Sequence, residues 1–209
     1  MNAVDDFRRH FAACPLVAII RGVTPDEVEA IGVALVTGGV QIVEVPLNSP
    51  DPLESIRRLS QCLGDRALVG AGTVLDTRQV RDVAEAGGRI VVSPNTDASV
   101  IRATVAAGMV SSPGYFTPSE AFTALEAGAH ALKLFPAEGA SPAVLKAQRA
   151  VLPKDLPILA VGGILPDNMR PWLDAGADGF GLGGGIYKPG QSPADTEARA
   201  RAYVAGLSA

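Results

Sequence analysis

A repeated pattern is the strongest constraint on what this chain can fold into. Short apolar runs alternate with amphipathic segments of about 10 to 15 residues. Many of these segments end in a small residue and a glycine, which can adopt the left-handed conformation that ends a helix. These expected helix ends are Gly39, Gly88, Gly108, Gly128 and Gly176. Proline in a first turn favours a helix start, and such starts are expected at Thr24-Pro25, Thr117-Pro118, Ser141-Pro142 and Pro166.

The apolar runs between these segments are too continuous for a half-exposed antiparallel sheet. They read LVAII, IVEVPL, ALVGAG, RIVVSP, MVSSP, HALKLF, PILAVGG and GFGLGG. Such runs, alternating with helices, predict a parallel sheet covered by helices on its faces. Eight units, after an extra amino-terminal helix at about residues 4–13, predict one α/β domain over residues 1–209, a single (β/α)8 TIM barrel. A doubly wound open sheet is the alternative.

Composition and charge exclude several classes of protein. The net charge is -4 and no basic tract is present, so no nucleic-acid partner is expected. No apolar stretch approaches the roughly 20 residues that a membrane span needs, and the acidic amino end does not resemble a secretion signal. We therefore expect a cytoplasmic protein. Cys14 and Cys62 are expected to be reduced thiols, and the scattered histidines and carboxylates predict neither a metal site nor a cofactor.

Polar residues occur late in, or just after, several of the apolar runs. These residues are Arg21, Glu44, Thr73, Asn95 and Lys133. In a parallel barrel the carboxyl ends of all strands open on one face, where barrel enzymes carry out their chemistry. The sequence therefore predicts that all five residues gather at one mouth.

Lys133 is the lysine that is embedded in a strand, whereas the other lysines fall on a helix or on turns. Alternation along the strand places Lys133 and Phe135 on one side and His130 on the other. Burying an ammonium group is costly unless the group is paired or loses its proton, and the neutral amine is a nucleophile. A buried ion pair with Glu44, with no catalytic task, is the alternative.

Glu44 and Arg21 are the other candidate reacting or binding groups. Burial raises the pKa of a carboxyl group towards neutrality, so Glu44 is the best candidate for a general acid or base. Arg21 carries a planar fork that suits a substrate carboxylate or phosphate. The alternatives are a structural ion pair between the two residues, or an arginine that ties down a loop.

Two glycine motifs follow the last two strands. Gly162 and Gly163 come after the seventh strand, and Gly183 and Gly184 after the eighth. In barrels these two loops commonly bind a phosphate through backbone N–H groups. Tight turns alone are the alternative, but two motifs in this order favour a phosphate site.

Six of these segments together resemble the 2-keto-3-deoxy-6-phosphogluconate/6-phosphogalactonate aldolase family. They are IIRG (19–22), VEVPLNSP (43–50), GAGTVL (70–75), VSPN (92–95), ALKLFPAE (131–138) and AVGGI (160–164). The resemblance covers essentially the whole chain. It implies a metal-free class I aldolase, homotrimeric, that cleaves a phosphorylated keto-deoxy sugar acid to pyruvate and D-glyceraldehyde 3-phosphate.

The resemblance also implies roles for single residues. Lys133 matches the Schiff-base lysine and Glu44 the proton-transferring carboxylate. The matches around the pyruvate-derived end are Arg21, Thr73, Pro94, Asn95 and Phe135, and those at the phosphate end are Gly162, Gly163, Gly183 and Gly184.

Within the family, PLNSP and SPN resemble the 6-phosphogalactonate branch. The gluconate branch typically has a threonine where this chain has Val161, and relatives often have a serine at Gly184. We therefore expect 2-dehydro-3-deoxy-6-phosphogalactonate as the substrate, with gluconate or dual specificity as the alternative. A phosphosugar isomerase or epimerase, in which Lys133 only polarises a carbonyl, and a non-catalytic binding protein for a phosphorylated acid also remain open.

Overall fold

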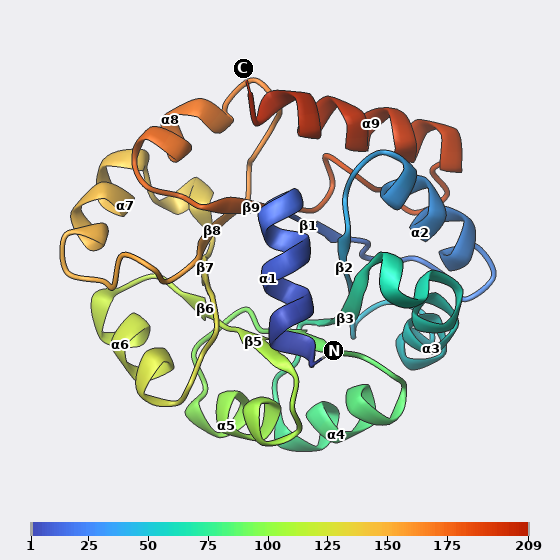
Figure 1. Cartoon of the computed structure of the whole chain (residues 1–209), viewed down its shortest axis with the longest axis horizontal. Helices are drawn as coiled ribbons and strands as arrows, with labels where there is room; N and C mark the ends of the chain where they lie inside the picture. The colour runs from blue at the N-terminus through green and yellow to red at the C-terminus, as the bar shows by residue number, and fades with distance from the viewer. Residues whose placement is uncertain (1, 209) are drawn as a thin grey trace.

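The computed structural model describes residues 2–208, which form a ring of parallel strands surrounded by helices (Figure 1). Its strands are β1 (Leu16–Ile19), β2 (Ile42–Pro46), β3 (Leu68–Gly72), β4 (Ile90–Val92), β5 (Val110–Ser112), β6 (Gly114–Tyr115), β7 (Leu132–Leu134), β8 (Ile158–Val161) and β9 (Gly179–Leu182). They pair in parallel in the order β5-β4-β3-β2-β1-β9-β8-β7-β6. This architecture confirms the predicted TIM barrel.

The barrel closes across Pro113, which separates β5 from β6. Proline has no N–H group to donate to a neighbouring strand, so the fifth strand position is split into two short segments. The first segment pairs with β4 and the second with β7. The N–H of Lys133 donates to the Pro113 carbonyl at 2.9 Å, and the N–H of Gly114 donates to the Ser93 carbonyl at 2.9 Å. The nine segments within residues 2–208 therefore fill the eight strand positions that the sequence predicts.

Helices cover the outside of the ring. They are α2 (Val28–Thr37), α3 (Pro52–Leu63), α4 (Thr77–Glu85), α5 (Ala98–Ala106), α6 (Pro118–Glu126), α7 (Pro142–Arg149), α8 (Met169–Asp174) and α9 (Pro193–Gly206). Short 3-10 helices are η1 (Gly64–Arg66) and η2 (Ala137–Gly139). Within residues 2–208, no helix is both long enough and apolar enough to pass through a bilayer.

The predicted extra helix, α1 (Ala3–Ala13), lies across the centre of the ring and closes one end of the barrel (Figure 1). Its Phe7 packs among side chains that point into the barrel. Asp6 forms an ion pair with Arg9 of the same helix at 2.9 Å, and it ties the helix to the barrel by an ion pair with Arg89, just before β4, at 2.5 Å. A ring nitrogen of His10 lies 2.9 Å from Oε1 of Gln41, so polar contacts also hold α1 in place.

Several expected helix boundaries are wrong by a few residues. Gly87 has the left-handed φ of 88° that was expected of Gly88. Helix α2 begins at Val28 because residues 24–27 form a turn, in which Glu27 Oε1 accepts a hydrogen bond from the Thr24 N–H at 2.9 Å. Similarly, α8 begins at Met169, after a turn in which Asn168 Oδ1 accepts from the N–H of Leu165 at 2.9 Å. The starts at Thr117-Pro118 and Ser141-Pro142 are confirmed.

Strand side chains divide into two cores. One lies between the sheet and the helices, and the other fills the barrel. In β2, Val43 and Val45 face the helices, whereas Ile42 belongs to the barrel interior. Successive side chains of a strand point to opposite faces, so Glu44, two residues after Ile42, also faces inward.

Candidate active site

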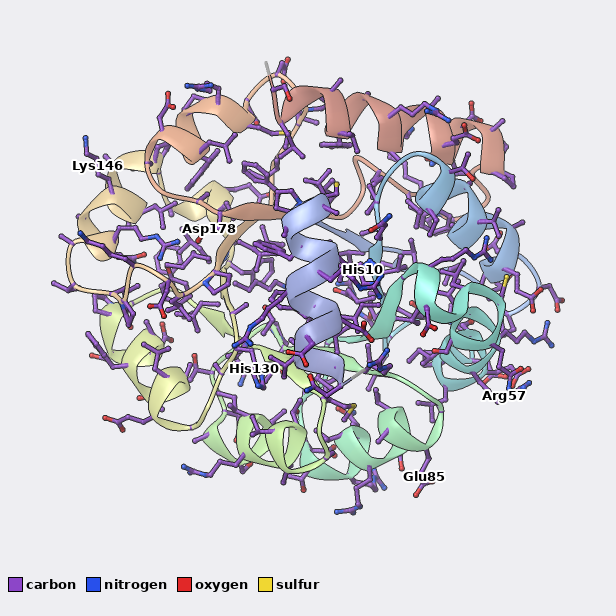
Figure 2. All side chains as sticks on the ribbon, viewed as in Figure 1. His10, Arg57, Glu85, His130, Lys146 and Asp178 are labelled. Atoms are coloured by element: carbon purple, nitrogen blue, oxygen red, sulfur yellow. The ribbon has the colours of Figure 1, made fainter. Side chains whose placement is uncertain are left out.

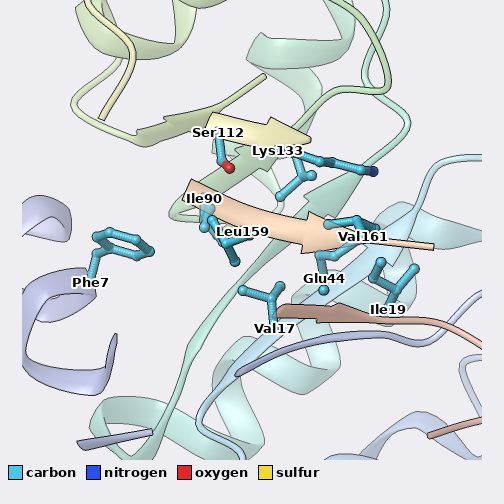
Figure 3. A pocket seen from close by; sticks show the side chains of 11 residues that line it. Phe7, Val17, Ile19, Glu44, Ile90, Ser112, Lys133, Leu159 and Val161 are labelled. Carbon is cyan, nitrogen blue, oxygen red and sulfur yellow. The ribbon is translucent and has the colours of Figure 1, made fainter. Parts of the chain in front are cut away.

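Lys133 points into the barrel from the middle of β7. Ala131 belongs to the interior core and Phe135 packs against it, while Leu132 and Leu134 belong to the outer core, so the predicted alternation is confirmed. Lys133 is only 7% exposed. Figure 3 shows its amine directed away from Phe7 and the closed end of the barrel. Its Nζ lies 4.6 Å from the centroid of the Phe135 ring, which forms one wall beside the amine.

Glu44 is buried in β2, and the adjoining strand makes room for its carboxylate. A β-carbon at Gly72, at the end of β3, would overlap the carboxylate of Glu44. Glu44 is 1% exposed, and its Oε2 has no hydrogen-bond partner among the described residues. A buried carboxylate oxygen without a partner is costly, and such a group favours its protonated form.

The electrostatics of Glu44 and Lys133 bring both groups towards a neutral form. Burial raises the pKa of Glu44 to about 7, although the positive charges of Lys133 and Arg21 oppose this rise. Burial also lowers the pKa of Lys133; Glu44 opposes this change, and Arg21 adds to it. No ion pair within 4.0 Å joins the two residues in the part of the chain that the structure describes. Burial therefore favours the neutral form of each group, and each group's charge opposes this change in the other.

A narrow cavity of about 10 Å³, roughly the size of one water position, lies between α1 and the two reactive groups (Figure 3). Its walls are mainly apolar side chains of Phe7, Val17, Ile19, Ile90, Val92, Leu159 and Val161. Glu44, Lys133 and Ser112 supply the polar groups. This apolar lining is the physical source of the desolvation that moves both pKa values.

Arg21 lies at the mouth, just after β1, and is exposed. Its Nη1 donates a hydrogen bond to Oδ1 of Asn48, which follows β2. The N–H of neighbouring Gly22 donates to Oγ of Ser49 at 2.9 Å. The loops after β1 and β2 are therefore joined by two hydrogen bonds, and the guanidinium charge lies close enough to influence both Glu44 and Lys133.

The backbones of Thr73 and Pro94 lie next to Glu44 and Lys133, respectively. Thr73 follows Gly72 and has a φ of 57°, a left-handed conformation that is strained for a β-branched residue. A β-carbon at Gly114, the strand partner of Lys133, would overlap the Pro94 carbonyl. Asn95 is exposed one residue later, and its side chain has no hydrogen bond within residues 2–208.

The glycine motifs form the outer part of the same end of the barrel. Gly162 and Gly163 have φ values of 113° and 66° and follow directly after Val161, which lines the cavity. The exposed Gly163 and Gly184 direct their N–H groups to no acceptor in the described chain. A β-carbon at Gly183 or Gly184 would meet no atom within 4 Å. Both motifs thus have accessible backbone near the mouth, as an anion site requires.

Two side chains shape the first of these glycine motifs. Nδ2 of Asn168 donates to the Gly163 carbonyl at 2.9 Å. Glu138, in the loop after β7, lies against both glycines, so that a side chain on Gly162 or Gly163 would collide with it. The loop that follows the lysine strand is therefore packed on the loop that carries the candidate anion site.

Sequence reasoning missed several residues of this site. Ser112 is buried and lines the cavity. Strand alternation could have predicted this position, because Val110, two residues earlier, belongs to the interior core. Two further features join segments that are distant in the sequence, so no local pattern predicts them. They are the space that Gly72 of β3 leaves for Glu44 of β2, and the hydrogen bond between Arg21 and Asn48 in the loops after β1 and β2.

The remaining lysines and the histidines lie away from this site. Lys146, Lys154 and Lys188 are exposed, and Figure 2 shows Lys146 at the periphery on α7. The His130 ring accepts a hydrogen bond from the Ser111 N–H at 3.1 Å, on the α1 side of the barrel. In the described range, no three His, Cys, Asp or Glu side chains are grouped so that they could hold a metal ion. Both cysteines are free thiols.

Comparison with known proteins gives consistent results. The family model for KDPG and KHG aldolase matches residues 8–192. The chain is 49% identical over 190 residues to the 2-dehydro-3-deoxy-6-phosphogalactonate aldolase of Escherichia coli (strain K12), covering 91% of this chain and 93% of that protein. A solved structure of native KDPGal superposes with a TM-score of 0.91 at 48% identity, covering 93% of this chain and 94% of the other.

A more distant solved structure also superposes well. It is a KDPG aldolase from Legionella pneumophila in which pyruvate is captured as a covalent carbinolamine intermediate. The TM-score is 0.81 at 27% identity, with 93% of this chain and 96% of the other covered.

Proposed function

The chain belongs to the KDPG and KHG aldolase family and is therefore an aldolase, and from this premise we propose that it cleaves 2-dehydro-3-deoxy-6-phosphogalactonate to pyruvate and D-glyceraldehyde 3-phosphate. The substrate follows the E. coli relative, which carries that activity in its name. The observation that carries the proposal is a buried lysine, Lys133, beside a buried carboxyl group with which it forms no close ion pair.

Lys133 is the nucleophile of the proposed reaction. Its lowered pKa increases the fraction of neutral amine, which adds to the C2 ketone of the substrate to form a carbinolamine. Loss of water then gives an iminium ion. The covalent carbinolamine that pyruvate forms in the Legionella relative supports the same chemistry here.

Glu44 carries the proton in both directions. As the bond between C3 and C4 breaks, its electron pair moves into the iminium, giving an enamine, and the Glu44 carboxylate takes the proton of the C4 hydroxyl. The aldehyde leaves, the protonated Glu44 returns the proton to C3, and water hydrolyses the new iminium to pyruvate and free Lys133. A pKa of about 7 suits a group that must both accept and donate a proton.

Binding at the two ends of the substrate would fix the reacting carbons. The Arg21 guanidinium suits the C1 carboxylate, because it is exposed at the mouth and its charge reaches both reactive groups. The accessible N–H groups of Gly163 and Gly184 suit the C6 phosphate. Thr73 and the Pro94 peptide would border the pyruvate-derived end, with Phe135 beside the amine. Asn95 would contribute to substrate binding at the rim of the barrel.

A cytoplasmic homotrimer that uses neither metal nor cofactor is the form that we propose.

Borohydride trapping tests this function. Incubation of the protein with pyruvate and borohydride should attach a reduced pyruvyl group to Lys133, detectable by peptide mass spectrometry, and should abolish cleavage. Lys133→Ala should give neither adduct nor activity, whereas Lys146→Ala, at an exposed position on α7, should behave like the wild type. Cleavage without any adduct would exclude Lys133 as the nucleophile. Turnover of a phosphosugar with neither adduct nor pyruvate release would favour an isomerase or epimerase. Binding without pyruvate release would favour a non-catalytic binding protein.

A further inference from the structure

The hydrogen bond between Arg21 and Asn48 connects two loops at the mouth of the barrel. Arg21 follows β1, and Asn48 follows β2, the strand that carries Glu44. A second link, from the Gly22 N–H to the buried Ser49 Oγ, holds the backbones of the same loops. The two links differ in what they fix: the first holds the guanidinium, and the second holds the chain that carries it.

An arginine side chain at an exposed position has many accessible rotamers, and a ligand that binds it must select one of them. A neutral amide oxygen can restrict the guanidinium without cancelling its charge, whereas a carboxylate in the same place would form an ion pair with it. Asn48 thus leaves the positive charge of Arg21 available to an anion. The same charge acts on both Glu44 and Lys133, so the guanidinium lies within electrostatic reach of the reactive groups.

We propose that Asn48 is a positioning residue that holds the Arg21 guanidinium in the orientation that binds the substrate carboxylate. The inference rests on the proposed aldolase function and adds a residue to which no role has been assigned. Asn48 acts through Arg21 and does not touch the reacting atoms. Its main effect is therefore on the affinity for the carboxylate, while Lys133 and Glu44 stay in place.

A double-mutant cycle on a partial reaction separates these effects. Iminium formation with pyruvate, followed by enamine formation, exchanges the C3 hydrogens of pyruvate with deuterium oxide, and NMR gives KM and kcat for this exchange. Asn48→Ala should raise KM for pyruvate about tenfold, as expected for a lost hydrogen bond to a charged group, with kcat within about twofold. Arg21→Ala should raise KM further. The double variant should match Arg21→Ala alone, because Asn48 has nothing left to position.

Two other variants serve as controls. Ser49→Ala breaks the second link and leaves the guanidinium in place, so its KM should stay within about twofold of the wild type. Asn48→Asp keeps an acceptor oxygen but adds a negative charge, so it should raise KM by offsetting the charge of Arg21. This second substitution also tests the inference if Asn48→Ala does not fold.

Three outcomes would overturn the role of Asn48: an unchanged KM in Asn48→Ala and Asn48→Asp, additive effects in the double variant, or an equal rise in Ser49→Ala. Failure of the wild type to exchange or to be trapped by borohydride would instead remove the proposed function itself. The two failures are thereby distinguished.

Discussion

The buried carboxyl group of Glu44 should contribute a loss of stability as pH rises. Its pKa is raised from 4.5 to about 7 in the folded chain, so between these values Glu44 binds more protons in the folded state than in the unfolded state. In that window the contribution of Glu44 to the free energy of unfolding falls as pH rises, and the full penalty for ionising Glu44 is present above about pH 8. At about 1.4 kcal/mol per factor of ten in proton affinity, the penalty is about 3 kcal/mol.

Glu44→Gln removes the ionisation and keeps nearly the same shape. Relative to the wild type, the variant should gain about 3 kcal/mol of stability between pH 4.5 and pH 8. For a chain of this size, that corresponds to a gain of about 6 to 12 °C in Tm. Any pH-independent effect of the buried amide cancels, because the prediction concerns the change with pH. Urea unfolding at a fixed protein concentration, followed by fluorescence of the buried Trp172, measures the difference.

Glu120→Gln provides a control of opposite sign. The N–H groups of Phe116 and Thr117 donate to the Glu120 carboxylate and lower its pKa. Glu120 therefore contributes to stability above the pKa that it has in the unfolded chain, and this contribution is lost as pH falls. A stability difference between wild type and Glu44→Gln that stays flat from pH 4 to pH 8 would refute the reasoning. It would mean that burial in the barrel does not raise the pKa of Glu44.

Three further substitutions test the site. Gly72→Ala should lower kcat about a hundredfold or more by displacing the Glu44 carboxylate, while borohydride still traps pyruvate; unchanged kcat would show that the overlap is relieved elsewhere. Gly184→Ser adds a hydroxyl in open space, so it should lower KM for the phosphorylated substrate about fivefold and leave KM for unphosphorylated aldehydes unchanged; equal effects on both would exclude a phosphate contact. Val161→Thr should shift the ratio of kcat/KM values for the two C4 epimers towards the gluconate substrate, and an unchanged ratio would exclude this position as the determinant.

Local patterns predicted most of this fold. Continuous apolar runs predicted parallel strands, and alternation within HALKLF correctly placed Lys133 on the inward side of β7. His130 precedes β7 and lies on the α1 side of the barrel. Local patterns predicted the wrong first residue for α2 and α8. In both places a side chain, of Glu27 or Asn168, accepts a hydrogen bond from a backbone N–H three residues earlier, and this turn competes with the helix. The split of the fifth strand position at Pro113 follows from its missing N–H group.

Contacts across the barrel were the part that the sequence could not supply. An ion pair between Glu44 and Lys133 was a reasonable alternative, and only the arrangement of the strands decides that none forms within 4.0 Å in the described chain. The same is true of the space that Gly72 leaves for the Glu44 carboxylate and of the hydrogen bond from Arg21 to Asn48. The partners in these contacts are tens of residues apart, so their meeting depends on barrel closure and strand register.

Phe7 and helix α1 close one end of the barrel, so the site opens at the other end, and this has a kinetic consequence. Lys133 pairs in register with Leu159, whereas Gly162 and Gly163 lie further along the same neighbouring strand and its loop, nearer the rim. In the proposed reaction the three-carbon acid is bonded at depth while the phosphorylated aldehyde lies above it. The aldehyde must then depart first during cleavage, and during synthesis it must arrive last. Steady-state product inhibition should show this compulsory order.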